Sequence, residues 1–402
     1  MTFPTGFSQL PPEGDTSARR AMRKVRLIAL RTLLTWPTRG LSPRVARGLV
    51  ALQGALVPLT KRAPDAALEI VGGPDALVQI LVHADRNRPP EALLRELVPH
   101  VLFQIGRRGL TRLLGEAVLW DVPVARLIDP EGPTVTFDAP AEGMLADPTG
   151  VEVRLAGGET RSLDALAHDE PARLVRIRDD LPARLALVDT NPLNMEEAHP
   201  EKAGNALNLD GRSVEQWRSA LDAALELIRV GLPGYYPELA HTLDRIVPVG
   251  YHDERHFSAS YRAAPATIYM SLHPNGLTMA EAIIHEVQHG KLNALTWLDP
   301  VLENGQTEWT KSPVRPDMRP LFGVLLAVHA FAPVAALHQG LKAAGHPEAD
   351  TAIYRRRVAE VRKANADALE TVKKVGKPTE MGRHLIAAID ALEAATSGRE
   401  GS

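Results

Sequence analysis

The sequence contains no cysteine among its 402 residues. This absence excludes disulfide bonds, thiolate zinc sites, iron–sulfur clusters and a cysteine nucleophile, so metal ligands must be histidines or carboxylates. The chain also shows no run of about eighteen apolar residues and no apolar signal segment, which favours a cytoplasmic location without stable membrane association. A formal net charge of −3 gives no global electrostatic reason to expect a nucleic-acid partner.

Apolar residues are plentiful by contrast, since 45% of the chain is hydrophobic, which is enough for a sizeable core. Residues 1–20 are polar and are expected to be loose, and helical patterns fill the rest of residues 1–121. Short β-branched runs broken by Pro and Gly predict a β-rich insert in residues 122–188. Residues 189–402 combine three short strands with amphipathic helices.

These patterns together predict an α+β fold that is predominantly α-helical. It has a helical N-terminal region, a small β insert and a C-terminal metal site built from strands and two helices. The first helix, expected from Ala18 to Thr35, is basic and amphipathic. Its charges could meet a membrane or an acidic partner, but a solvated face on a core helix is the simpler interpretation.

The segment Thr278–Trp297 carries the motif HEVQH, formed by His285, Glu286 and His289. Apolar residues recur along it at helical spacing, and Thr278 with Glu281 matches a capping box. Because residues four apart on a helix lie one turn above each other, the two imidazoles can reach one metal ion while Glu286 projects beside it. The segment is too apolar for a solvated face, so its imidazoles need partners. The sequence therefore predicts a metal site on a buried helix.

An HExxH motif first suggests a zinc peptidase, in which the Glu is the general base and a third ligand follows downstream. The extended motif HExxHxxGxxH fails, because Leu292 and Leu295 stand where Gly and His are required. Glu308, nineteen residues after His289, is the carboxylate candidate of this class. Its Pro- and Lys-containing surroundings do not resemble the second buried helix that such enzymes use.

A different third ligand is His329, which follows His289 by forty residues and lies in an apolar helix expected from Pro320 to Ala343. An unpaired imidazole in these surroundings would be costly. A hydrogen bond from the ring to a backbone carbonyl would satisfy the imidazole as well as a metal ion would. The residues alone leave both interpretations open.

Several segments between about Asp189 and Leu337 resemble the 2-oxoglutarate-dependent HExxH-type peptide β-hydroxylases, which modify ribosomally made peptides. These segments are NPLNMEEAHPEKAGNALNL, the PVG turn, AIIHEVQHGKLNAL, RPDMRPLFG and VHAFAPVA. The resemblance implies Fe(II) held by His285, His289 and His329, with 2-oxoglutarate and O2 as cosubstrates. It also implies an oxidoreductase, a dioxygenase that hydroxylates the β-carbon of an Asp, Asn or His in a precursor peptide.

The role of Glu286 depends on which of these classes is correct. Imidazoles suit Fe(II), and three facial ligands leave room for a bidentate 2-oxo acid and O2. A third His in place of the usual carboxylate raises the charge of the site by one, so Glu286 is expected to compensate from beside the metal. In a peptidase the same residue would be the catalytic base.

The distal carboxylate of 2-oxoglutarate requires a cation, and Arg offers the best fork for it. The leading candidates are Arg319 and Arg315, just before the His329 helix, followed by Lys291. Salt bridges or surface exposure are the alternative for the two arginines.

The peptide is expected to add to a strand edge within His256–Leu272 and to meet the long polar loop from Asn191 to Gly211. Amide and imidazole groups of this loop can bond to peptide groups. The alternative is that both segments are scaffold and that the substrate is a free small molecule.

Overall fold

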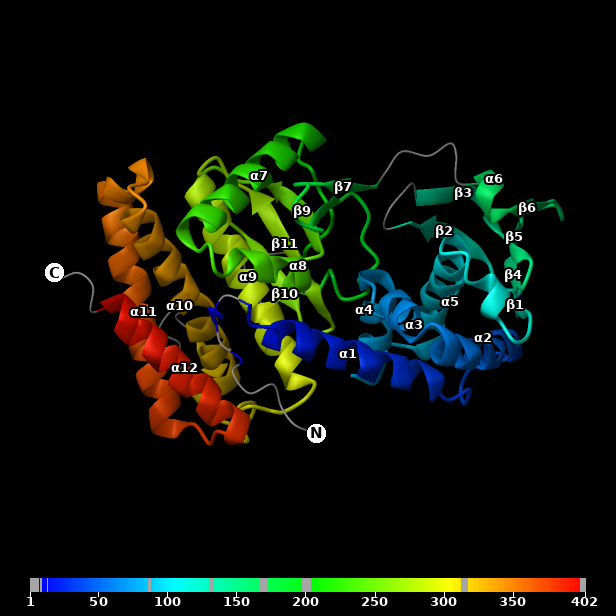
Figure 1. Cartoon of the computed structure of the whole chain (residues 1–402), viewed down its shortest axis with the longest axis horizontal. Coiled ribbons are helices and arrows are strands. Elements are labelled where there is room, and N and C mark those ends of the chain that lie inside the picture. Colours follow the sequence, from blue (N-terminus) through cyan, green and yellow to red (C-terminus); the bar gives the residue numbers. More distant parts are fainter. Residues whose placement is uncertain are drawn as a thin grey trace. The chain divides into compact units, whose positions relative to one another are not determined.

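The computed structural model describes residues 7, 9–12, 14–85, 88–129, 134–166, 173–196, 204–311 and 317–397. The fold is α+β and mostly helical, as the sequence predicts, and Figure 1 labels its elements. The chain divides into two compact units. Unit 1 consists of Met1–Val25, Arg176–Leu185 and Leu207–Ser402, and unit 2 of Arg26–Val175 and Ala186–Ala206. Unit 2 thus combines most of the predicted helical region with most of the predicted β-rich insert.

Unit 2 contains helices and small antiparallel sheets. Its elements are the second part of α1 (Ser17–Leu34), α2 (Pro43–Arg62), α3 (Pro64–Val71), α4 (Pro74–Ala84), α5 (Pro90–Arg107), η1 (Thr111–Leu113), β1 (Val118–Trp120), β2 (Val124–Ile128), β3 (Thr134–Ala141), β4 (Gly143–Asp147), β5 (Gly150–Arg154), β6 (Thr160–Ser162) and α6 (Leu163–Leu166). Helices α2 to α5 each start with a proline, whose missing N–H costs no intrahelical bond there. The strands form the sheet β1-β4-β5-β6 and the hairpin β2-β3.

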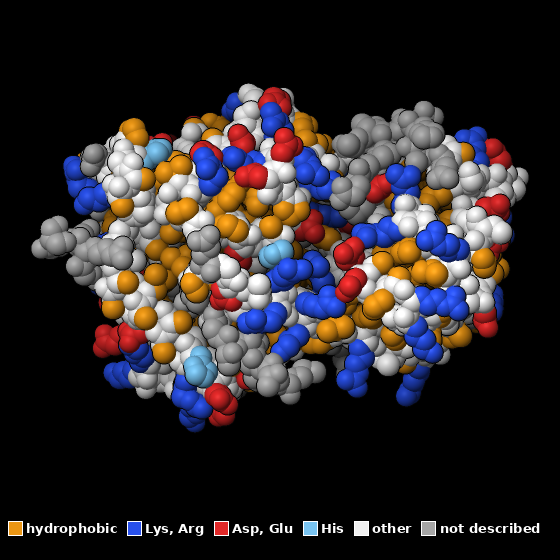
Figure 2. All heavy atoms as spheres, viewed as in Figure 1, with side chains coloured by type: hydrophobic (Ala, Val, Ile, Leu, Met, Phe, Trp, Pro, Cys, Tyr) orange, Lys and Arg blue, Asp and Glu red, His pale blue; other side chains and the backbone are white. Residues whose placement is uncertain are grey.

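Helix α1 is as basic as the sequence suggests, with six Lys or Arg residues and no acidic one. Figure 2 shows blue side chains gathered over it in the lower middle of the view. Its inward face carries buried residues such as Val25, Ala29 and Leu33. The helix is therefore amphipathic, with its charges on the solvated side.

The sheet of unit 1 leads directly into the motif helix. Among the described residues its strand order is β10-β11-β9-β8-β7. The bounds are β7 (Leu174–Arg176), β8 (Arg184–Ala186), β9 (Arg245–Tyr251), β10 (Ser258–Tyr261) and β11 (Ala264–Leu272). β10 pairs antiparallel with β11, while β11 and β8 both run parallel to β9. β11 is buried along its whole length, which explains its continuous run of apolar and small residues.

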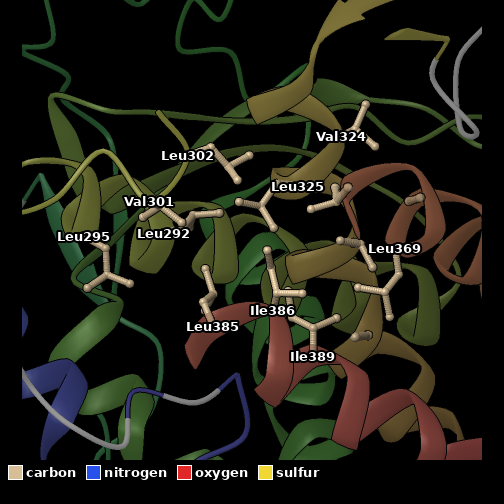
Figure 3. Close-up of a cluster of buried hydrophobic side chains, with 14 of the residues drawn as sticks. Leu292, Leu295, Val301, Leu302, Val324, Leu325, Leu369, Leu385, Ile386 and Ile389 are labelled. Carbon is tan, nitrogen blue, oxygen red and sulfur yellow. The ribbon is translucent and has the colours of Figure 1, made fainter. Parts of the chain in front are cut away.

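Unit 1 also contains helices and a short hairpin. They are α7 (Val214–Gly231), η2 (Tyr236–Glu238), α8 (Leu239–Thr242), α9 (Gly276–Thr296), α10 (Leu321–Ala343), η3 (Pro347–Asp350), α11 (Ala352–Val375) and α12 (Glu380–Ser397), with the hairpin β12 (Trp309–Lys311) and β13 (Met318–Pro320). Ser213 caps α7 as predicted. Figure 3 shows the core between the last four long helices, with Leu292 from α9, Leu325 from α10, Leu369 from α11 and Ile386 from α12.

Helix α10 is long and apolar enough to cross a membrane by length and composition, so the expectation that the chain has no such run is wrong. Within the protein, 78% of its most apolar window is buried, as in the core helix of a soluble protein. Helices α3 and α4 pass the same test only as one span bent by 73°. Pro333 lies inside α10 without ending it.

The described part of the N-terminal segment is packed, so the expectation of a loose segment is wrong there. Phe7 is 5% exposed and Gln9 is fully buried. The Gln9 carbonyl accepts hydrogen bonds from Gln288 Nε2 at 2.9 Å and from Lys291 Nζ at 3.2 Å. Both donors lie on α9, so partners distant in sequence order this segment.

Candidate metal centre

The N-terminus of α9 is capped differently from the prediction. The Asn275 side chain accepts a hydrogen bond from the Thr278 N–H at 3.0 Å, which satisfies one of the free amides of the first turn. The predicted capping box of Thr278 and Glu281 is wrong, because the Glu281 carboxylate binds side chains of α10 and α11 instead. The helix therefore begins two residues earlier than expected, at Gly276.

A glycine sets the distance between α9 and the sheet. A Cβ atom at Gly290 would lie 2.2 Å from the Pro265 carbonyl oxygen of β11, a separation that no side chain tolerates. Gly290 follows His289 directly. The close approach that glycine permits therefore fixes the position of the second histidine of the motif relative to β10 and β11.

His285, Glu286 and His289, hereafter the metal group, are brought together as predicted. One ligand atom from each lies within 4.8 Å of the other two. The two imidazole centroids are 4.2 Å apart. Nδ1 of His285 and Nε2 of His289 are buried and make no hydrogen bond with the described residues. Because buried polar atoms without partners are costly, this set of nitrogen and oxygen donors fits a metal ion.

The protonation of the metal group favours metal binding. Burial, followed by the neighbouring His289, lowers the pKa of His285 to about 3, so its imidazole is neutral near neutral pH. Burial alone would raise the pKa of Glu286, but His289, His285 and a bond from Ser258 outweigh it and hold that pKa well below its usual range. The group therefore offers the neutral imidazole of His285 beside the charged carboxylate of Glu286.

Ser258 supports the Glu286 carboxylate and was not anticipated from the sequence. Its Oγ donates a hydrogen bond of 2.7 Å to Oε1 of Glu286. Ser258 begins β10, where it pairs with Met270 of β11. The only sequence signal was its place in the strand predicted from His256 to Tyr261. A bond of this kind orients a carboxylate at a metal site.

His329 lies near the metal group but outside the 4.8 Å cluster. Its side chain is fully buried, and neither ring nitrogen makes a hydrogen bond with the described residues. Its ring stacks with that of Phe7 at a centroid distance of 6.4 Å. Burial, then Lys291 and His289, hold its pKa well below the usual value. The role of His329 as third ligand stays a prediction.

The residue of α10 that contacts the first motif histidine is Phe331. Its ring centroid lies 4.4 Å from that of His285. Residues two apart on a helix point about 200° apart, so Phe331 and His329 face different sides of α10. Phe331 is thus a residue of the site that sequence reasoning missed.

The predicted cations lie in different surroundings. Nε of Arg319, on β13, is 3.6 Å from Asp317. Arg315 lies outside the described residues. Nζ of Lys291 is 2.5 Å from a Glu238 oxygen, and its side chain is 1% exposed, so this ammonium belongs to a buried ion pair. Glu308 of the peptidase interpretation precedes β12 and is not part of the metal group.

A second cluster on α9, hereafter the Glu281 cluster, consists of Glu281, His338 and Arg357. Nε2 of His338 lies 2.6 Å from Oε1 of Glu281. Nε and Nη2 of Arg357 donate to Oε2 at 3.0 and 2.9 Å. Burial raises the pKa of Glu281, but both partners outweigh it and lower that pKa. The partners lie 57 and 76 positions from Glu281, so no local pattern predicts the cluster.

The predicted substrate loop uses several of its amides internally. Asn194 Nδ2 donates to Asp189 at 2.9 Å, and Asn208 Oδ1 accepts from the Asp210 N–H at 2.8 Å. Asn208 also forms an isolated β-bridge with Val249 of β9. Residues 197–203, which include His199, lie outside the described residues.

No family model matches the chain, and no curated protein sequence matches it either. The resemblance to the peptide β-hydroxylases therefore rests on the sequence motifs given above.

Proposed function

We propose that the protein is a cytoplasmic Fe(II)- and 2-oxoglutarate-dependent dioxygenase that hydroxylates the β-carbon of an Asp, Asn or His residue in a ribosomally synthesised peptide. The observation that carries the proposal is the metal group, with two histidine nitrogens that are buried and lack hydrogen-bond partners among the described residues. The motif resemblance supplies the reaction class. In this reaction a peptide C–H, 2-oxoglutarate and O2 become C–OH, succinate and CO2.

The side chains around the metal group have separate tasks in this proposal. Bound iron, with 2-oxoglutarate and O2, supplies the oxidising chemistry. His285 and His289 hold the ion through their ring nitrogens. Glu286 offsets the positive charge of the ion, and the hydrogen bond from Ser258 keeps its carboxylate in place.

The peptide is proposed to lie along β10. This strand ends the sheet order among the described residues, and its first residue, Ser258, contacts Glu286. A peptide that follows the strand would therefore pass beside the metal group. Main-chain bonds would supply affinity, while the side chain to be hydroxylated would point toward the metal.

The test is an assay of anaerobically purified, Fe(II)-loaded protein with 2-oxoglutarate, O2 and a precursor peptide encoded near its gene. We expect succinate and a peptide that gains one oxygen at a β-carbon. His285→Ala should abolish both products, whereas His384→Ala, which changes an exposed histidine of α12, should leave them unchanged. Cleavage of the peptide without oxygen gain would refute the hydroxylase.

The third metal ligand is decided by two variants. If His329 is the ligand, His329→Ala should weaken Fe(II) binding by more than about 100-fold, because even residues that only support a ligand cost 10- to 100-fold. If Glu286 is the ligand, Glu286→Gln should have this effect instead. Metal titration of the two variants distinguishes these cases.

A zinc peptidase is the second candidate, and one observation favours it. A charged carboxylate next to two imidazoles, fixed by Ser258, is what a general base that takes a proton from water requires. A peptidase would cleave peptides when loaded with zinc. Glu286→Gln would then stop cleavage while the zinc stays bound.

A further inference from the structure

Arg357 of α11 presents a guanidinium group close to the metal group. Its side chain is 42% exposed, and its Cζ lies 5.9 Å from the centroid of the Phe331 ring. Phe331 in turn contacts His285. Phe331, His285 and Arg357 are each partly exposed, and the two ring contacts connect Arg357 through Phe331 to the metal group.

The Arg357 guanidinium is held in place with one end available. Nε and Nη2 both donate to the same Glu281 oxygen. Its Nη1 makes no hydrogen bond with the described residues, and Glu281 shares its charge with His338. A planar guanidinium fixed along one edge is already oriented to bind a carboxylate with the other.

We propose that Arg357 binds the distal carboxylate of the 2-oxo acid, with Phe331 packed against the methylene groups between the two ends. This assignment rests on the proposed function, since it takes 2-oxoglutarate to be the cosubstrate. It adds a residue and a subsite that the sequence did not indicate.

The distances set an upper limit on the separation that this ligand would have to span. The centroid distances of 4.4 Å and 5.9 Å place Cζ of Arg357 within about 10 Å of the His285 ring centroid. The carboxyl carbons of an extended five-carbon diacid are about 5 Å apart. A hydrogen bond of about 3 Å to Arg357 at one end, and binding of the 2-oxo acid head at the metal group at the other, would extend the span of the ligand further.

The earlier candidates suit this task less well. Arg319 lies twelve positions before Phe331. From its first residue, Leu321, to Phe331, α10 alone spans about 15 Å. An arginine side chain covers less than half of that length. Lys291 is already neutralised by Glu238 in the interior.

The experiment is calorimetric titration of Fe(II)-loaded protein under nitrogen with two ligands. 2-Oxoglutarate carries the distal carboxylate, and 2-oxobutanoate has the same 2-oxo acid head without it. Arg357→Gln should weaken 2-oxoglutarate binding about 10- to 100-fold and leave 2-oxobutanoate binding unchanged. Arg357→Lys keeps the charge without the fork and should fall between wild type and Arg357→Gln.

Matched controls keep the test specific. Arg356→Gln removes the neighbouring arginine, which is 84% exposed and pairs with Glu360, and should change neither affinity. Equal losses for both ligands in the Arg357 variants would show a purely structural role and overturn the assignment. A selective loss in Arg319→Gln, with Arg357→Gln like wild type, would overturn it as well.

Failure of the proposed function gives a different result. In that case wild-type protein would bind the metal but not 2-oxoglutarate, and the assignment of Arg357 would fall with it. If both Arg357 variants bind 2-oxoglutarate as tightly as wild type, the assignment of Arg357 is overturned and the proposed function stands. Arg357 also supports Glu281, so metal content and thermal unfolding of each variant are measured first. If Arg357→Gln does not fold, the comparison of Arg357→Lys with wild type tests the assignment.

Discussion

Glu281, the centre of the Glu281 cluster, lies one turn before the metal group on α9, and both groups pair a glutamate with histidine. In the Glu281 cluster, both carboxylate oxygens have a partner, one from His338 and one from Arg357. In the metal group, Ser258 satisfies Oε1 of Glu286, while Oε2 is buried and makes no hydrogen bond with the described residues. One buried histidine nitrogen without a hydrogen bond to the described residues occurs in the Glu281 cluster, at His338, and two occur in the metal group, at His285 and His289. The Glu281 carboxylate, with both oxygens satisfied, therefore stabilises the fold and holds Arg357 in place, whereas the metal group keeps open donor atoms for a ligand.

The largest expected effect comes from removing one histidine of each cluster. His289→Ala should abolish tight binding of Fe(II) or zinc and leave the unfolding free energy of the metal-free protein close to wild type. His338→Ala should lower that free energy and leave metal affinity nearly unchanged. Metal titration and urea unfolding of both variants test this. If His338→Ala lost the metal as completely as His289→Ala, the two clusters would have to be treated as one site.

The next effect concerns the charge of Glu281. Glu281→Gln should lower the unfolding free energy near neutral pH by about 2–3 kcal/mol, because it leaves Arg357 and His338 without their anion. The folded-state pKa of Glu281 is below the ordinary value of 4.5. The stabilisation is therefore complete above pH 4.5 and is lost as pH falls through the lowered pKa.

Urea unfolding of wild type and Glu281→Gln across this pH range measures the prediction. The two curves should converge in acid. Glu360→Gln, which changes an exposed carboxylate of α11, is the control and should have little effect at any pH. A difference that grows as the pH falls would contradict the assigned sign.

The smallest expected effect is that of Ser258→Ala. The variant removes the hydrogen bond to Glu286 but no ligand, so metal affinity should fall by about tenfold and the fold should persist. Ser260→Ala on the same strand is the matched control. Equal affinities in the two variants would show that Ser258 does not position the carboxylate.

Local patterns predicted the helix that bears the motif and the strands before it. His285 and His289 converge because a four-residue spacing on any helix places side chains on one face, and this geometry does not depend on the rest of the fold. The start of α9 was mispredicted for the opposite reason. Glu281 matched a capping pattern, but partners on α10 and α11 compete for its carboxylate, and only the folded chain brings them near.

The side of α10 that meets the motif could not be read from its sequence either. The helix is apolar on nearly all sides, so its hydrophobic pattern does not fix its rotation. Packing places Phe331 against His285, whereas His329 stacks with Phe7. The sequence could not indicate Arg357 as a residue of the site, because only this packing places it against Phe331 and thus near the metal group.

The bonds from Gln9 to α9 also constrain the order of events during synthesis. The carbonyl of Gln9 is bonded to side chains 279 and 282 positions later in the chain. At roughly 5–20 residues per second, a ribosome needs about 15–60 s to reach them. The segment around Gln9 thus leaves the ribosome long before its binding surface exists. The first described residues of the chain are therefore among the last to reach their final positions.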